Sequence, residues 1–182
     1  AGGPNLSPPP EGLQEAIVAS ATGAPSHVLS EDLRAEHLPG CNLVLRREAL
    51  DSIGGFQPQF VTAGDDVDLC WRLLDQGWEL AFAPAAFVWH RRRTSIARYL
   101  RQQGGYGRAE ALLFEVHPGR FRDGGIHWKG SVYSGGPVSA DTRSVIYFGS
   151  MGQAGYQGLA HHAVPRRPLH RRFNSPTSRG LL

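Results

Sequence analysis

The sequence predicts an α/β chain in which helices flank a sheet of mixed strand direction. One observation is a helix face on which apolar residues recur at positions i, i+3, i+4 and i+7, namely Val67, Cys70, Trp71 and Leu74. A second is the segment 78–89, in which both alternating sets of side chains are largely apolar. Such a strand is typical of a sheet that helices cover on both faces.

The first part of the chain is predicted to alternate short helices and strands. Residues 1–10 contain four prolines and are expected to form a loop, because proline lacks an amide donor and fixes φ. A helix that begins near residue 46 is expected to stop at Gly54 and Gly55. The predicted elements are a helix at 11–20, a strand at 27–29, a buried strand at 42–45 and a helix at 46–53.

Two longer helices are predicted further along. Asp65 or Asp66 is expected to cap the helix with the apolar face described above, and Gly77 is expected to end it. Thr94 is expected to cap a second helix that runs to about residue 114.

The chain is predicted to divide into three segments. Residues 1–118 form the main α/β part, and 119–160 form a glycine-rich extension with short strands near 128–133 and 145–148. Residues 161–182 are rich in Pro, Arg, His and Ser and have little to bury, so a disordered tail is expected there.

Length, charge, apolar runs and cysteine number limit the kinds of protein that this chain can be. The 182 residues fit one domain, with a net charge of +3 and no acidic residue after Asp141. The first residue is Ala, and we expect a fragment whose beginning lies elsewhere. The longest uncharged apolar run, 80–89, is short of the about 20 residues that a membrane helix needs. Cys41 and Cys70 form no disulfide framework, which favours a reducing cytosol.

The adjacent acids Asp65 and Asp66 are the first candidates for chemistry. Transfer of a group to a hydroxyl requires a base, and a carboxylate within hydrogen-bond reach serves as one. At a helix start the backbone amides and the helix dipole favour ionised carboxylates. The alternative is that the two acids only cap the helix.

His90 ends the apolar segment 78–89 and is the second candidate. The carboxyl ends of strands are where open α/β sheets place their sites, and a neutral imidazole there is a ligand for a divalent metal. Arg91, Arg92 and Arg93 follow directly. They suit a phosphate-bearing ligand, or they form the solvated start of the next helix.

Three stretches carry a family resemblance. Residues 38–56 read LPGCNLVLRREALDSIGGF, residues 64–73 read GDDVDLCWRL and residues 83–90 read APAAFVWH. They resemble the second half of family 2 glycosyltransferases with the GT-A fold. That family shows a G-x-N strand, a helix ending in GGF, an acid-Asp-x-Asp-Leu helix and a strand ending in His. The resemblance covers residues 1–118 and implies a partial GT-A fold, Rossmann-like, without its nucleotide-binding first half.

The resemblance implies an inverting displacement on a nucleotide-sugar donor. Asp66 matches the family's catalytic base, and Asp65 is expected to orient the acceptor. His90 matches a histidine of the metal shell, which implies Mg²⁺ or Mn²⁺ as the cofactor. The other assignments are Asn42 and Trp89 for the acceptor, and Arg91 and Arg93 for the donor phosphate.

The implied partners follow from that reaction. They are a nucleotide-sugar donor and a carbohydrate, a lipid-linked molecule or another hydroxyl acceptor, and no specific nucleic acid is expected. The predicted location is the cytoplasm, with peripheral association at the inner face of the membrane as an alternative.

Two departures from the family pattern matter. No Asp-x-Asp metal motif precedes Asp65, so the donor pocket is expected to lie outside this chain and the chain alone to be inactive. The segment 102–106 reads QQGGY rather than the Q-x-x-R-W of processive synthases. A role like that of cellulose or chitin synthases is therefore disfavoured.

Two other functions stay open. The basic residues of 161–182 allow a nucleic-acid-binding module, although Phe173 is the one aromatic ring among them. A chain without a donor half is also compatible with a non-catalytic half-domain that assembles with another protein.

Three further residues are assigned to structure rather than function. Glu36 and His37 allow two interpretations, part of a metal or acceptor site or polar residues on a surface loop, and the surface loop is favoured. Trp71 is expected to pack in the core, because it shares the apolar helix face. Trp89 allows two interpretations, a ring stacked on a sugar or an aromatic buried in a strand.

Overall fold

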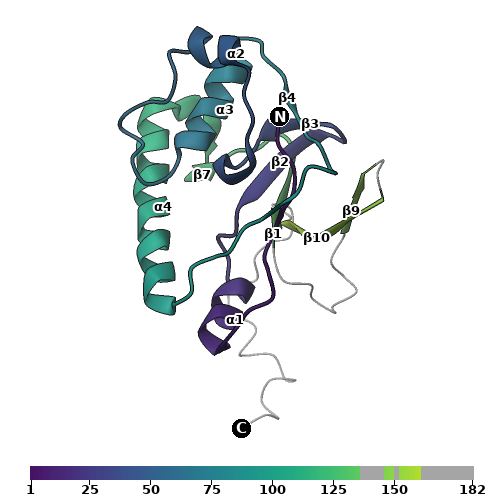
Figure 1. Cartoon of the computed structure of the whole chain (residues 1–182). Helices are drawn as coiled ribbons and strands as arrows, with labels where there is room; N and C mark the ends of the chain where they lie inside the picture. The colour runs from purple at the N-terminus through teal and green to yellow at the C-terminus, as the bar shows by residue number, and fades with distance from the viewer. Residues whose placement is uncertain (136–145, 150–151, 161–182) are drawn as a thin grey trace.

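A six-stranded antiparallel sheet lies at the centre of the computed structural model, which describes residues 1–135, 146–149 and 152–160 (Figure 1). The strand order is β4-β3-β2-β8-β10-β9, and each neighbouring pair is antiparallel. Because β8 pairs with β2, strands far apart in the sequence share this sheet. The strands are β2 (Ser26–Glu31), β3 (Arg34–His37), β4 (Leu80–Ala81), β8 (Ser131–Gly135), β9 (Ile146–Gly149) and β10 (Gly152–Ala160).

Helices cover the sheet and extend beyond it. The last turns of α4 lie beside α3, and its first turn lies toward α1 (Figure 1). The α-helices of the described residues are α1 (Leu13–Ser20), α2 (Arg47–Ser52), α3 (Asp65–Asp75) and α4 (Ile96–Val116), and the short 3-10 helices are η1 (Gly40–Asn42) and η2 (Pro118–Arg120).

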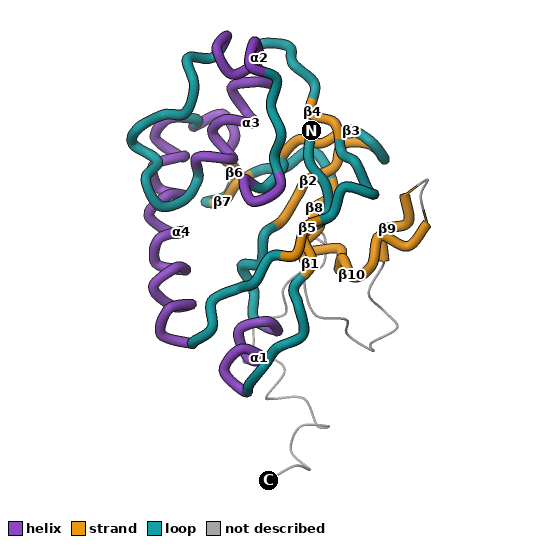
Figure 2. Tube along the Cα trace, in the orientation of Figure 1, coloured by secondary structure: helices purple, strands orange, loops and turns teal. Residues whose placement is uncertain are grey.

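Two small sheets complete the architecture. Strand β1 (Asn5–Leu6) pairs in parallel with β5 (Val88–Trp89), and the amide of His90 donates to the carbonyl of Leu6 at 2.8 Å (Figure 2). Strands β6 (Phe121–Arg122) and β7 (Gly125–Ile126) form a hairpin. The β1–β5 pair holds the start of the chain against the segment that carries His90.

Helix α3 is fixed on two faces. One face, with Leu69 and Leu73, packs against apolar residues of β2, β3 and β4. The other face buries Trp71 completely, against Phe60 and Leu113. Full burial of each such side chain stabilises the fold by about 1.5–3 kcal/mol. The first turn of α3, which carries the two acids, is therefore held in place from both sides.

A close helix–helix contact requires glycine at the start of α3. Gly64 precedes the helix with a φ of 82°, in the left-handed region that favours glycine. A Cβ atom there would lie 3.2 Å from side-chain atoms of Ala109 and Phe60. Helix α4 can therefore pack directly against the beginning of α3.

The predicted α/β architecture is confirmed, and the predicted helices are present within a few residues of their expected limits. The expected mixture of strand directions is absent from the six-stranded sheet, which is antiparallel throughout, and among the described strands the parallel pairing is that of β1 with β5. The capping residues differ. Gly64 precedes α3, so that Asp65 and Asp66 are its first two residues rather than its cap. Ser95, not Thr94, caps α4, because the Ser95 side chain accepts the amide of Arg98.

Two predicted strands are wrong. Residues 42–45 contain no strand, because the amide of Asn42 bonds to Pro39 in η1 and that of Val44 bonds to Ala1. Residues 78–89 hold two separate two-residue strands instead of one. Between them Pro84 interrupts the ladder, and the amide of Ala86 closes a turn onto Ala83.

Several elements were not predicted, namely β1, β3, the β6–β7 hairpin, β10 and the short helices η1 and η2. Strand β1 lies within residues 1–10, so the prediction of a loop throughout that stretch is wrong. The predicted strands near 128–133 and 145–148 correspond to β8 and β9. The expected disordered tail, with its basic residues, lies outside the described residues, and the limits of the three predicted segments stay a prediction. Within the part of the chain that the structure describes, no helix is long and apolar enough to cross a membrane.

Candidate active site

Asp66 lies at the meeting point of α3, η1 and β3. Its Oδ2 accepts the amide of Gly40 at 2.9 Å, and its Oδ1 accepts the amide of Val67 at 2.9 Å. The Nε2 atom of His37 lies 3.8 Å from Oδ2. The Asp66 side chain keeps 24% of its surface exposed, so a ligand can still reach the carboxylate.

These contacts decide the charge of Asp66. Burial disfavours the charged form, but the His37 imidazole and the amides of Gly40 and Val67 outweigh it and lower the pKa of Asp66 below its ordinary value. The neighbouring Asp65 behaves in the opposite way, because burial and the charge of Asp66 raise its pKa. Asp66 is therefore the carboxylate of the pair that stays ionised and able to accept a proton.

Asp68, the third acid of the helix, is structural. Its side chain is fully buried, with Oδ2 2.7 Å from the Arg72 guanidinium and Oδ1 2.8 Å from Nε2 of His117. Arg72 also donates to the carbonyls of Ile53 and Gly55. Both oxygens of Asp68 are occupied, so this carboxylate ties α3 to its surroundings and is closed to a ligand.

Glu36 and His37 are buried, so their assignment to a surface loop is wrong. They lie in β3 and are 6% and 5% exposed. Oε2 of Glu36 accepts the amides of Lys129 and Gly130, which join β3 to the segment before β8. His37 faces Asp66 and is the site residue that the sequence interpretation set aside as part of a surface loop. Its position two residues before the P-G-C-N turn was the available signal.

A second group of polar residues lines a hollow between the segment 90–93 and α4. His90 and Arg93 lie in it with Tyr106 of α4. Burial, and then the charges of Arg92 and Arg93, lower the pKa of His90, so its ring is neutral near pH 7. Burial, and then the charge of Asp66, raise the pKa of Tyr106 while the two arginines oppose this. Tyr106 therefore lies in the electrostatic field of both the acid and the arginines.

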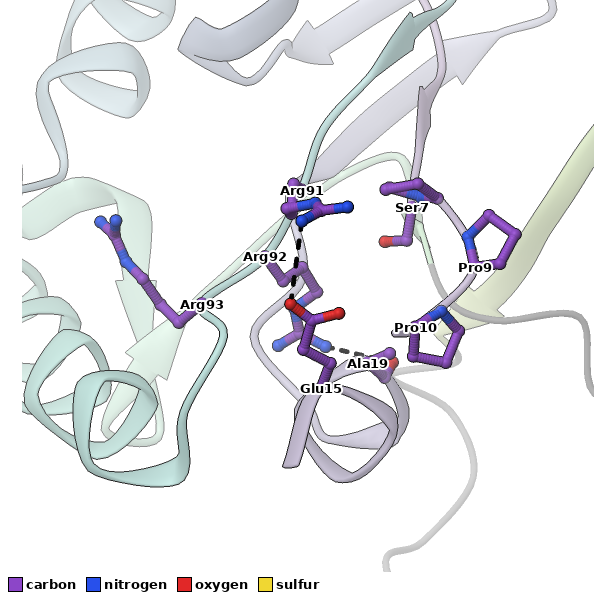
Figure 3. Close-up of a pocket in the computed structure, with 9 residues that line it drawn as sticks. Ser7, Pro9, Pro10, Glu15, Ala19, Arg91, Arg92 and Arg93 are labelled. Atoms are coloured by element: carbon purple, nitrogen blue, oxygen red, sulfur yellow. Dashed lines mark hydrogen bonds and ion pairs between the residues drawn. The ribbon is translucent and has the colours of Figure 1, made fainter. Parts of the chain in front are cut away.

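The three consecutive arginines have different surroundings. Arg91 forms an ion pair with Glu11. It forms a second one with Glu15 at 3.9 Å (Figure 3). Arg92 donates to the carbonyls of Ala19, Ala21 and Thr22 and so caps the end of α1. Arg93 is exposed, and its side chain points away from Glu15 (Figure 3). Of the three, Arg93 is the guanidinium most available to an anion.

The two residues assigned to the acceptor also differ. The Asn42 amide nitrogen donates to the carbonyls of Pro4 at 3.1 Å and Ala86 at 2.8 Å, so both of its hydrogens hold loops together. Trp89 is 63% exposed and meets Phe87 edge to face, with ring centroids 6.2 Å apart. Trp89 is thus not the buried strand aromatic of one interpretation, and its ring is open to a ligand.

The divalent metal that the resemblance implies has no complete site among the described residues. No group of three or more His, Cys, Asp or Glu side chains is gathered there in a way that could hold an ion. His90 offers one buried ring nitrogen, Nδ1, without a hydrogen-bond partner, and its neighbours are arginines. A single imidazole does not make a metal centre.

Comparison with known families identifies this part of the chain. Residues 19–105 match the model of the family described as "Glycosyltransferase like family 2". Residues 19–105 are a glycosyltransferase family 2-like domain. The matched stretch of this domain contains η1, the acid pair, His90 and the three arginines. The mixed α/β architecture is consistent with a partial GT-A-like fold.

Two curated relatives from Mycobacterium tuberculosis resemble part of the chain. One, named pre-mycofactocin glycosyltransferase, is 37% identical over 82 residues, which are 45% of this chain and 17% of the relative. Another, named N-acetylglucosaminyl-diphospho-decaprenol L-rhamnosyltransferase, is 38% identical over 61 residues, which are 34% of this chain and 20% of the relative. The matches thus span a fifth or less of each relative's length. No solved structure matches the chain significantly.

Proposed function

We propose that the native protein transfers a sugar from a nucleotide-sugar donor to an acceptor hydroxyl, with Asp66 as the general base. The observation that carries the proposal is the state of Asp66 inside the family 2-like domain. It is an ionised carboxylate, held by two backbone amides and open on one side. A base of that kind is what the attack of a hydroxyl on a sugar requires.

The proposed step is an inverting displacement. Asp66 takes the proton from the acceptor hydroxyl as the hydroxyl oxygen forms its bond to the anomeric carbon of the donor. The bond from that carbon to the diphosphate breaks at the same time, and the diphosphate leaves with the bonding electrons. Asp65, whose pKa is raised by burial and by Asp66, is assigned the role of orienting the acceptor by hydrogen bonding.

The donor diphosphate is assigned to the hollow beside Tyr106. Arg93 supplies a guanidinium there, which is a strong donor to phosphate oxygens. The neutral His90 ring lies in the same hollow and remains the candidate for one metal ligand in the native protein. The Arg91 role in phosphate binding also stays a prediction, and the ion pairs with Glu11 and Glu15 make it the weaker candidate.

The acceptor is assigned to Asp66 and Trp89, whose ring is exposed. An exposed aromatic ring can stack on a sugar or on another ring that has both apolar and polar parts. The names of the two relatives specify unlike acceptors, and the comparison favours neither for this protein.

The test is a screen of the native gene product with UDP-, GDP- and dTDP-sugars, in which release of nucleoside diphosphate is followed with and without candidate acceptors. We expect release with at least one donor, and a product whose anomeric configuration, read from its NMR coupling constant, is opposite to that of the donor. Retained configuration would overturn the inverting step. No release from any donor in the presence of lipid-linked, carbohydrate and small hydroxyl acceptors would count against the transferase.

A further inference from the structure

His37 is buried in a way that packing alone does not explain. It is 5% exposed, and neither Nδ1 nor Nε2 has a hydrogen-bond partner among the described residues. Leaving a buried polar atom unpaired costs about 1–3 kcal/mol, so an apolar side chain of similar size would serve the fold better. The nitrogen Nε2 is directed at Oδ2 of Asp66, at 3.8 Å.

The groups around His37 leave Asp66 as its natural partner. The ring of Trp128 lies against one side, at 5.5 Å between centroids. His27 lies on the neighbouring strand β2. Burial, and then the charge of His37, lower the pKa of His27, so the His27 ring is neutral and is not a charged partner for His37. The carboxylate of Glu36, next in sequence, is committed to the amides of Lys129 and Gly130.

The 3.8 Å between Nε2 of His37 and Oδ2 of Asp66 describes a pair that is close but not yet hydrogen-bonded. This distance is longer than a hydrogen bond, which spans about 2.7–3.2 Å, and a small side-chain rotation or one bridging water closes the gap. Catalytic hydrogen bonds are often long until a ligand is bound. The Asp68–His117 pair on the same helix is already closed at 2.8 Å, and there the carboxylate also binds Arg72 and is sealed from solvent.

We propose that His37 is a positioning residue for Asp66, which directs its Nε2–H at Oδ2 and holds the carboxylate with its other lone pairs toward the acceptor. The inference rests on the proposed role of Asp66 as the base. His37 itself neither gains nor loses a proton in the step: the proton of the acceptor hydroxyl goes to Asp66. Together, Gly40 and His37 hold one oxygen from two directions, which leaves the carboxylate a single orientation.

The amide of Gly40 makes the pair measurable without a substrate. It donates to Oδ2 of Asp66, so its ¹⁵N and ¹H shifts follow the ionisation of that carboxylate. The native gene product and its variants are labelled with ¹⁵N-glycine and titrated with acid. We expect the pH at the midpoint of the Gly40 shift change to be higher in His37→Leu than in the native protein. His37→Gln keeps an N–H donor of similar reach and is expected to move it less. His127→Gln, at an exposed histidine, is the matched control and should not move it.

A second measurement needs no substitution at His37. A long-range ¹H–¹⁵N spectrum of the native protein near neutral pH reports which ring nitrogen carries the proton, and we expect Nε2–H. An Nδ1–H tautomer, with bare Nε2 facing the carboxylate, would overturn the inference. So would an unmoved Gly40 midpoint in His37→Leu, provided that Asp66→Asn abolishes the titration and so validates the reporter.

The two proposals fail separately in this design. If Asp66→Asn retains transfer while the Gly40 midpoint still depends on His37, the proposed function is wrong and the pairing stands. If transfer requires Asp66 and the midpoint ignores His37, the inference alone is wrong.

Discussion

The backbone amide of Gly40 donates to Oδ2 of Asp66 at 2.9 Å and so joins two segments that lie 26 residues apart in sequence. One is the P-G-C-N turn that forms η1, and the other is the first turn of α3. Together with His37, which has the larger effect, the Gly40 amide lowers the pKa of Asp66 against the effect of burial. The turn supplies a donor that the helix start alone does not provide.

A pair of substitutions at Gly40 tests this contact. A Cβ atom at Gly40 would lie 3.6 Å from Cβ of Asp66, an ordinary contact, so Gly40→Ala keeps the amide and should retain transfer. Gly40→Pro suits the backbone, because Pro39 is extended with a ψ of 141°. It removes the donor, however, and places a ring carbon against Oδ2. We expect transfer to fall at least about tenfold in Gly40→Pro, in line with the loss of a hydrogen bond to a charged group.

Thermal unfolding serves as the control for that pair. If Gly40→Pro unfolds at the native temperature and keeps full transfer activity, the amide of Gly40 has no part in the function of Asp66.

Much of this geometry follows from local patterns in the sequence. The α3 helix was predictable because Val67, Cys70, Trp71 and Leu74 repeat at helical spacing and Gly77 follows. The selection of Asp66 within the acid pair came from the family resemblance and stays a prediction.

The remainder depends on contacts between distant segments. His37 is buried because β3 lies between β2 and β4 and because the segment before β8 bonds to Glu36, and none of these pairings has a local signal. Strand β3 also contains charged residues, so its sequence lacks the alternation of apolar and polar residues that predicts a strand. The difference between Arg91 and Arg93 arises from Glu11, which precedes α1, and from Glu15 of α1, which lie some 80 residues earlier.

The acid Asp68 is predicted to matter for stability rather than for transfer. Removing one member of a buried charge pair leaves the others unpaired and costs about 3–5 kcal/mol, so Asp68→Ala should lower the free energy of unfolding by about that amount. Asp51→Ala, which removes an exposed pair with Arg47, should cost less than about 1 kcal/mol. Urea denaturation measures both. Equal effects of the two substitutions would contradict the structural role of Asp68.

His27 is predicted to make stability depend on pH. Its ring stacks between Phe82 and Tyr133, and burial, with the charge of His37, lowers its pKa from 6.5 to about 3. The folded state thus keeps His27 neutral while the unfolded chain takes up a proton below about pH 6.5. Stability should therefore fall as the pH drops from 6.5 toward 3, by up to about 1.4 kcal/mol per unit from this group.

Replacement of His27 isolates that contribution. His27→Phe removes the titration and keeps an aromatic ring in the stack, so its stability relative to the native protein should increase as the pH falls. The measurement is the urea midpoint at pH 7 and pH 4.5, with His127→Phe as the surface control. If the native protein and His27→Phe lose the same stability between pH 7 and pH 4.5, His27 is not the group responsible.

The arginines predict a difference in nucleotide binding. Arg93→Ala should weaken binding of a nucleoside diphosphate about 10-fold or more, because a charge-assisted contact to phosphate is lost. Arg91→Ala should change it about twofold or less, because Glu11 and Glu15 already occupy that guanidinium. Titration calorimetry of the native gene product with UDP, GDP and dTDP tests this. Equal weakening by the two substitutions would mean that Arg91 leaves its acidic partners to bind the ligand.

The most direct test of the account is the effect of Asp66→Asn on transfer and on donor binding, measured in the same preparation of the native gene product. Asparagine is nearly isosteric and cannot accept the acceptor's proton. We therefore expect the transfer rate to fall at least about 100-fold, while the Kd for the nucleoside diphosphate changes little. Transfer near the native rate, or a loss of diphosphate binding as large as the loss of transfer, would contradict the assignment of Asp66 as the base.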